Sequence, residues 1–301
     1  MIGRIVEIAQ DYRYLSVYRG FLIIEETRPE RKQVGKVPLD DIHSLIINSH
    51  GVSFSANLAV VLGEKSVPIV FCGPNHQPVS YCLPLTANYE QTKRINAQAK
   101  LSEDGKLAFW TEVVRAKIDS QAALLKALGK TYLPLLRISE KVSLGDPSNC
   151  EAQAAKAYWK ILFGTGFKRD KSLSGTNSLL NYGYTILRST VLRSIVSVGL
   201  HPSLGIHHRN AGNPMCLADD LMEPYRPLID HVVFNLSGEP VEELTSEHKR
   251  ALVSVMHKNV RFDGQIVPVS SAIERNINSF CWRCVDKSAD MDYQWVARNT
   301  G

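Results

Sequence analysis

Long hydrophobic runs are absent from this 301-residue chain. No run reaches the roughly 18 apolar residues that a membrane-spanning helix needs. Charged residues also interrupt the first twelve residues, where a secretory signal peptide would have its apolar core. We therefore expect a cytoplasmic protein that does not associate with a membrane.

Cysteine is scarce, with six residues, and a reducing cytoplasm would keep them as free thiols. Only Cys281 and Cys284 form a CxxC motif, and the second ligand pair of a structural zinc site is missing. A buried helical pair beside Trp282 is therefore favoured over zinc. The phosphate-cradling loop GxxxxGKS/T is missing as well, which disfavours a hydrolase of small phosphoesters.

The net charge is mildly positive, at +5 with a pI near 8.8. This balance favours a polyanionic partner, although many proteins that never touch nucleic acid share it. With 44% hydrophobic residues, the chain can bury a substantial core as one large or two modest domains.

Residues 1–75 are rich in the β-branched and aromatic residues of short strands. Arg19-Gly20 lies between two such runs and predicts a two-residue hairpin turn. A short helix is expected at about 55–63. Strands and turns at this density indicate a small β-sandwich-like domain, followed by a linker at 76–87.

From residue 88 to 301 the apolar spacing changes to the period of a helix. Two long amphipathic stretches end at Gly129 and Gly199, as helices often do at glycine. Further helices are expected near 245–258 and 270–285. The sequence thus predicts an α+β protein in which a larger all-α domain follows the β-rich one.

Adjacent histidines and a group of acids follow the second of these long helices. His207 and His208 lie in a Gly-bounded turn, and Asp219, Asp220 and Glu223 come shortly after. Asp220 and Glu223 are three residues apart, so a helix would project both within reach of one ion. A divalent metal site is the first hypothesis. The common alternative is that the acids favour a helix start and that the histidine is a polar turn residue.

Glu151 belongs to a second candidate segment, the turn and helix predicted at 146–164. It shares a helical stripe with Ala155 and Tyr158, so a carboxylate lies on a face that otherwise packs inward and needs a partner there. Ser148-x-x-Glu151 is also a capping box, in which the carboxylate would bond the N-cap backbone. Both interpretations remain open at this point.

Together these segments resemble a known family, the CRISPR-associated spacer-acquisition integrase, which is the catalytic endonuclease subunit of CRISPR adaptation. The resemblance rests on Glu151 with Ala154, Ala155 and Tyr158, followed by SLLNYGYTILRSTVLRSIVSVGLHPSLGIHH and LADDLMEPYRPLID. It runs from the opening GRIVEI through the last helices and looks closest to the branch associated with a single-protein effector nuclease. It implies a helical catalytic domain. It also implies a metal-dependent enzyme that inserts short duplex DNA, the protospacer, into a CRISPR repeat array by 3′-hydroxyl attack on a phosphodiester.

The resemblance implies that Glu151, His208 and Glu223 are the catalytic metal ligands, with Asp220 as a supporting acid. His208 matches the family's histidine because it closes the Gly-x-x-His spacing from Gly205. Two carboxylates and one imidazole would leave coordination positions open, which suits Mg²⁺ or Mn²⁺.

Several further side chains are candidate phosphate or DNA contacts. Arg209 is favoured because it follows the ligand histidine, whereas charge runs are usually solvated and helical tyrosines usually pack. The full set is Tyr182, Tyr184, Lys168, Arg169, Lys171, Arg188, Arg193 and Arg209.

The expected partners follow from the resemblance alone. It implies a homodimer that binds double-stranded protospacer and repeat DNA. The dimer would join a small partner, the second universal CRISPR-associated protein, in a heterohexamer-type complex. The effector nuclease and a further adaptation protein are expected to help select protospacers. Two other functions stay open, a general metal-dependent DNA nuclease and a non-catalytic DNA-binding scaffold.

Overall fold

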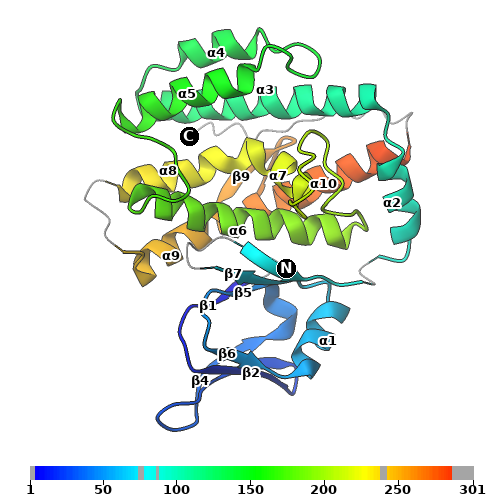
Figure 1. Ribbon diagram of the computed structural model, residues 1–301, viewed down its shortest axis with the longest axis vertical. Helices are drawn as coiled ribbons and strands as arrows, with labels where there is room; N and C mark the ends of the chain where they lie inside the picture. The colour runs from blue at the N-terminus through cyan, green and yellow to red at the C-terminus, as the bar shows by residue number, and fades with distance from the viewer. Residues whose placement is uncertain (1–3, 74–77, 86–87, 238–242, 287–301) are drawn as a thin grey trace.

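The computed structural model describes residues 4–73, 78–85, 88–237 and 243–286. Strands build its N-terminal part and helices build most of the larger C-terminal part, which confirms the predicted α+β architecture (Figure 1). None of the helices in the described ranges is long and apolar enough to cross a membrane. The outer ends of the expected linker, 76–77 and 86–87, lie outside the described residues.

The N-terminal domain consists of two four-stranded sheets and one helix. The first sheet has the order β1-β5-β7-β8, and the second has the order β4-β3-β2-β6. The helix α1, Ala56–Glu64, begins at the N-cap Ser55. The strands are β1 Arg4–Ile8, β2 Arg13–Tyr18, β3 Phe21–Glu26, β4 Lys32–Pro38, β5 Ile42–Ile47, β6 Val52–Phe54, β7 Ile69–Cys72 and β8 Pro78–Cys82, with a 3-10 turn η1 at Leu39–Asp41.

Local chemistry explains the first hairpin and corrects the expected linker. Arg19 and Gly20 have φ of 48° and 80°, as a type I′ turn between β2 and β3 requires. The stretch 76–87 is not simply a linker, because β8 pairs antiparallel with β7 inside it. The first residue of β8 is Pro78, and the first position of a strand tolerates a residue without a backbone N–H.

Strand β5 is apolar on both faces because the first sheet lies between two cores. Leu45 and Ile47 point into the sandwich, whereas Ile46 joins the core of the helical domain. Figure 1 shows α6 lying against this sheet, and α6 contacts β5. The two domains therefore share a packed junction.

The helical domain is arranged around α6, a 22-residue helix that is buried on most of its surface. The long helices α3 and α6 end before Gly129 and Gly199, whose φ values of 67° and 76° confirm the predicted stops. The domain is not wholly α-helical, because β9 and β10 form a hairpin before α10. Its elements are α2 Gln91–Ala99, α3 Glu103–Ala127, α4 Leu133–Ser139, α5 Cys150–Phe163, α6 Thr176–Ser197, α7 Cys216–Met222, η2 Glu223–Tyr225, α8 Arg226–Leu236, α9 Ser246–Ser254, η3 Val255–His257, β9 Asn259–Phe262, β10 Gln265–Pro268 and α10 Val269–Val285.

A polar cluster ties the two domains together at Glu7 in β1. Its carboxylate accepts hydrogen bonds from the Tyr182 hydroxyl at 2.6 Å and from Asn48 at 2.7 Å, and it pairs with Lys249 of α9 at 3.0 Å. Tyr182 is buried. Its hydroxyl therefore serves the domain junction, and the alternative that this tyrosine is a packing residue describes it better than a DNA contact does.

We predict that Gly183→Ala destabilises the protein by about 1–3 kcal/mol, although alanine is the better helix former. A Cβ at Gly183 in α6 would lie 2.4 Å from Cγ2 of Ile229 in α8, inside the buried contact between these helices. Gly63→Ala in α1 is the matched control, because nothing lies within 4 Å of its added Cβ. The control should be neutral or stabilising by about 0.5–1 kcal/mol. Denaturant unfolding measures both, and equal midpoints would contradict the packing argument.

Candidate active site

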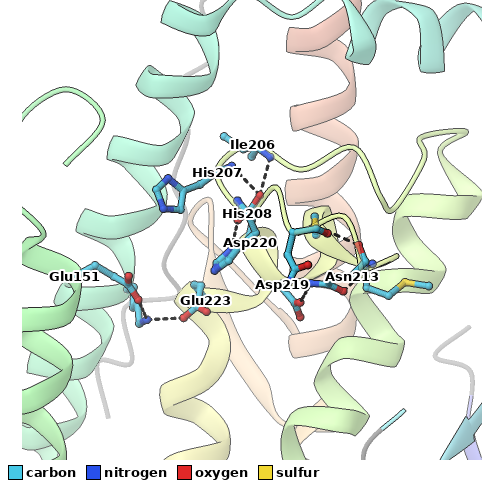
Figure 2. Close-up of polar contacts among 12 residues, drawn as sticks. Glu151, Ile206, His207, His208, Asn213, Asp219, Asp220 and Glu223 are labelled. Atoms are coloured by element: carbon cyan, nitrogen blue, oxygen red, sulfur yellow. Dashed lines mark hydrogen bonds and ion pairs between the residues drawn. The ribbon is translucent and has the colours of Figure 1, made fainter. Parts of the chain in front are cut away.

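The side chains predicted as metal ligands come together from three separate elements. Glu151 lies near the start of α5, His208 in the segment between α6 and α7, and Glu223 at the start of η2 (Figure 2). Lys117, in the middle of α3, forms ion pairs with both glutamates. Residues far apart in the chain therefore meet at one place.

The capping of α5 leaves the Glu151 side chain available to the site. Asn149 is the N-cap residue, and Asp146 accepts the backbone N–H of Glu151 at 2.9 Å. The Glu151 carboxylate pairs with Lys117 instead of returning to the cap. The capping box predicted from Ser148 is therefore wrong, because the cap lies one residue later.

Asp220 organises the histidine turn. Its fully buried carboxylate accepts the backbone N–H groups of Ile206, His207 and His208 at 2.6, 3.0 and 3.2 Å. It also lies 2.5 Å from Nδ1 of His208, so Nδ1 carries the proton and Nε2 is the nitrogen that can bind a ligand. A Cβ at Gly205 would lie 2.4 Å from the His208 carbonyl oxygen, which explains the glycine in this turn. Asp220 therefore supports His208 and does not act as a simple helix-start acid.

Two effects bear on the neighbouring rings. The hydrogen bond to Asp220 raises the pKa of His208 in spite of partial burial, whereas burial lowers the pKa of His207. The His207 ring stacks on Trp110 of α3, with centroids 4.0 Å apart and planes 4° from parallel. His207 thus packs the turn against α3 and leaves His208 as the histidine facing the acids (Figure 2).

Glu223 is held between the buried Lys117 and the partly buried Arg226. Its Oε1 lies 2.9 Å from Arg226 and its Oε2 lies 2.6 Å from Nζ of Lys117. Burial alone would raise the pKa of Glu223, but Arg226 and Lys117 hold that pKa below its ordinary value. Burial would likewise lower the pKa of Lys117, but Glu223 and Glu151 raise it. Glu223 is thus an ionised carboxylate in a buried setting.

Asp219 and three candidate arginines have other partners. Asp219 lies in the first turn of α7, where the alternative of a helix-start acid applies, and it pairs with Arg188. Arg209 pairs with Glu103 of α3 at the surface, and Arg193 donates to a backbone oxygen of β5 at 3.3 Å. These contacts account for the three arginines without a phosphate.

Tyr184 is a packing residue with a bonded hydroxyl. Its O–H and that of Tyr158 both donate to Asp230, at 2.5 and 2.7 Å, and all three residues are buried. Burial raises the pKa of Asp230 to about 6, against the effect of the two hydroxyls. Tyr184 and Asp230 line a small cavity.

This cavity, of about 200 Å³, is lined mainly by cationic and aromatic side chains. Arg169 donates to the neutral side-chain oxygens of Asn177 and Asn181, at 2.9 and 2.8 Å. Within the described residues, no carboxylate lies at ion-pair distance from Lys171. Burial lowers the pKa of both cations, and the charge of Arg226 adds to that effect. The lining residues are Lys117, Gln121, Ala155, Trp159, Arg169, Lys171, Tyr184, Arg226 and Asp230.

Lys168 differs from its two neighbours in the basic cluster. Its side chain is 79% exposed and pairs with Asp170 at 3.5 Å. The structure therefore divides the cluster into a solvated lysine and two cations, Arg169 and Lys171, that face the cavity.

The donor set of the site fits a divalent cation. As the side chains lie, no three His, Cys, Asp or Glu residues in the described ranges are grouped closely enough to hold one ion. The Lys117 ammonium lies where the two glutamates meet, and Oε2 of Glu223 accepts no aligned hydrogen bond although the ammonium is 2.6 Å away. Carboxylate oxygens with an imidazole Nε2 suit Mg²⁺ or Mn²⁺. Glu151, His208 and Glu223 are the residues that would hold the ion.

Sequence reasoning missed Lys117 and Arg226. Lys117 lies on the buried stripe of α3 between Val114 and Gln121, so a lysine at that spacing required an anionic partner. Arg226 follows Glu223 by three residues, a spacing that favours an ion pair along one helix face. Both signals were present in the sequence.

We predict that Asp220→Asn lowers the pKa of His208 towards its ordinary value, because a neutral amide replaces the charged acceptor. The folded-state pKa of His208 is raised, so its contribution to stability is present below the unfolded-state pKa and is lost as pH rises through the folded-state pKa. The variant should lose this part of the pH dependence. Titration of the ring protons by NMR measures the change. Asp219→Asn is the control and should alter it far less; an unchanged His208 pKa in Asp220→Asn contradicts the assignment.

Most of the chain is similar in sequence to known proteins. The family model described as CRISPR associated protein Cas1 matches residues 6–254. A CRISPR-associated endonuclease Cas1 of Neisseria meningitidis serogroup C (strain 8013) is 34% identical over 279 residues, which cover 91% of this chain and 90% of the relative. A relative of the same description from Francisella tularensis subsp. novicida (strain U112) is 27% identical over 299 residues, 88% of this chain and 90% of its own.

Solved structures share the fold. A casposase bound to integration product has a TM-score of 0.80 at 20% identity, with 96% of this chain and 93% of that one covered. A CAS1 protein from Thermotoga maritima has a TM-score of 0.77 at 19% identity, with 94% and 97% covered. The family match and the Neisseria relative, together with this fold, show that the chain belongs to the Cas1 family of CRISPR-associated proteins.

Proposed function

We propose that this Cas1-family chain is a metal-dependent DNA integrase and endonuclease that inserts protospacers into a CRISPR repeat array. One observation carries the proposal: Glu151, a histidine oriented by Asp220, and Glu223 lie together beside a cavity lined by cations. The endonuclease name of the relatives and the integration product in the casposase structure support the class of reaction.

The residues of the chain have distinct parts in this reaction. Bound Mg²⁺ or Mn²⁺ would supply the Lewis acid that polarises a phosphodiester. Asp220 accepts the Nδ1–H of His208 and so leaves Nε2 as the ring nitrogen that can bind the ion, and Arg226 keeps Glu223 ionised. The nucleophile is a DNA 3′-hydroxyl, whose oxygen bonds to phosphorus as the bond to the target strand's own 3′ oxygen breaks. The enzyme forms no covalent bond to DNA in this scheme.

The cavity cations would bind the DNA backbone. Arg169 is partly buried and Lys171 is exposed, both line the cavity, and neither forms an ion pair with a carboxylate among the described residues. Such cations favour an anion in the space between them. We assign the phosphate contacts to these two residues in preference to Arg188, Arg193 and Arg209, which have partners within the chain.

The partners proposed are double-stranded DNA, a second copy of the chain and the small second CRISPR-associated protein. Support comes from a solved Cas6-RT-Cas1–Cas2 complex, which this chain matches with a TM-score of 0.75 over 36% of that longer chain. A heterohexamer-type assembly, cytoplasmic action and cooperation with an effector nuclease and a further adaptation protein belong to the same proposal.

The direct test is an integration assay with the small partner, a short duplex bearing free 3′-hydroxyls and a supercoiled plasmid carrying the cognate repeat. We predict joining that requires Mn²⁺ or Mg²⁺ and that falls at least about 100-fold in Glu151→Ala and in His208→Ala. Glu140→Ala removes an exposed glutamate of the same helical domain and is the matched control. It should join DNA as the wild type does.

Each other outcome of that assay favours a different function. Cutting that depends on metal but gives no joined product indicates a general nuclease. DNA binding without any reaction, unchanged by metal or by Glu151→Ala, indicates a scaffold. Trapping of a protein–DNA adduct would refute direct attack by the 3′-hydroxyl.

We also predict that Arg169→Ala and Lys171→Ala weaken DNA binding for all sequences and each reduce the salt slope of log K by about 0.9. Each variant loses one phosphate contact, so one counterion fewer is released from the DNA when the protein binds. Fluorescence anisotropy across a salt series measures the slope. Lys168→Ala is the control, because that lysine is exposed and paired with Asp170. Equal slopes for all three variants would place the cavity outside the DNA path.

A further inference from the structure

Lys117 connects the two carboxylates proposed as metal ligands. Its Nζ pairs with Oε1 of Glu151 and lies 2.6 Å from Oε2 of Glu223. The side chain is only 9% exposed and comes from α3, whereas the glutamates come from α5 and η2. A buried ammonium requires anionic partners, so the two glutamates account for its charge and its position.

The same carboxylate oxygens cannot hold this ammonium and a divalent ion at once. A bound Mg²⁺ lies about 2 Å from its oxygen ligands. An ammonium in contact with those oxygens would then face a double positive charge at short range in a poorly solvated site. The ammonium lies 2.6 Å from Oε2 of Glu223, close enough that an ion bound to this oxygen would meet it directly. Lys117 therefore has to move when an ion binds through these same two oxygens.

A second position for the ammonium exists on the same helix. Gln121 lies one turn after Lys117, is 3% exposed, and has an Oε1 that accepts no hydrogen bond from any described residue. Both side chains line the cavity of about 200 Å³ beside the glutamates. A buried acceptor with an unmet hydrogen bond is unfavourable. An ammonium that moved into the cavity would supply its donor.

We propose that Lys117 is an exchangeable counter-ion, which holds Glu151 and Glu223 together before the metal binds and moves towards Gln121 when the metal is loaded. The inference rests on the proposed function, because it takes the two glutamates as metal ligands. In its second position the ammonium adds its charge to Arg169 and Lys171 around the cavity. Metal loading and phosphate binding then favour each other.

Mn²⁺ binding to the full-length protein, followed by electron paramagnetic resonance of the free ion, tests the exchange. Lys117→Met removes the competing cation and keeps an apolar side chain of similar length. It should bind Mn²⁺ about 5- to 150-fold more tightly than the wild type, the range of a typical coupling between two sites. Lys117→Arg keeps the charge and should bind close to the wild type. Equal or weaker binding by folded Lys117→Met overturns the proposal.

Gln121→Leu tests the second position independently. It removes the acceptor while filling the same buried space, and it should weaken Mn²⁺ binding several-fold in the wild type. The same change should have no effect on Mn²⁺ binding in the Lys117→Met background, because no ammonium remains to be received. Equal effects in both backgrounds overturn the proposal. If Lys117→Met does not fold, Gln121→Leu decides alone, and an unchanged affinity contradicts the exchange.

Glu151→Ala separates failure of this inference from failure of the proposed function. Loss of Mn²⁺ binding in Glu151→Ala supports the ligand assignment, whatever the Lys117 variants do. If Glu151→Ala binds Mn²⁺ with the affinity of the wild type, both the ligand assignment and the counter-ion role are contradicted. A wild type that binds no Mn²⁺ has the same consequence.

Discussion

The contact of Lys117 with Glu151 and Glu223 is the interaction on which the site depends. Two carboxylates from different elements would repel each other in a buried place, and the lysine of a third element removes that repulsion. Asp220 stabilises the histidine turn, because its carboxylate accepts three backbone N–H groups and orients His208. The helices around α6 thus deliver each group already paired.

Much of the fold could be predicted because local chemistry decides it. Arg19-Gly20, Gly129 and Gly199 all adopt positive φ, and each lies where a turn or a helix end was expected. Strand β8 was missed because Pro78 was interpreted as part of a linker, although proline is tolerated at a strand's first residue. The pairing of distant strands, such as β1 with β5, depends on tertiary packing that no local pattern specifies.

The site could be predicted in part. Glu151 stands out in the sequence as an acid on a stripe that packs inward, and Glu223 stands out because it lies one helical turn after Asp220. Their shared partner Lys117 also lies on a buried stripe, but a lysine on a long amphipathic helix is usually solvated, so the stripe alone did not identify it. Sequence order also could not separate cations that face the cavity, such as Arg169, from those that neutralise a nearby acid, such as Arg188. That distinction depends on which side chains the fold brings within reach, so only the structure could make it.

Anomalous diffraction from crystals of the protein soaked in Mn²⁺ would test the exchange of Lys117 for a metal ion most directly. We predict a single manganese peak bounded by the carboxylates of Glu151 and Glu223 and by Nε2 of His208, with the Lys117 ammonium displaced towards Gln121. A peak bound by other residues, or an ammonium still seated between the two glutamates in a metal-loaded crystal, would contradict it.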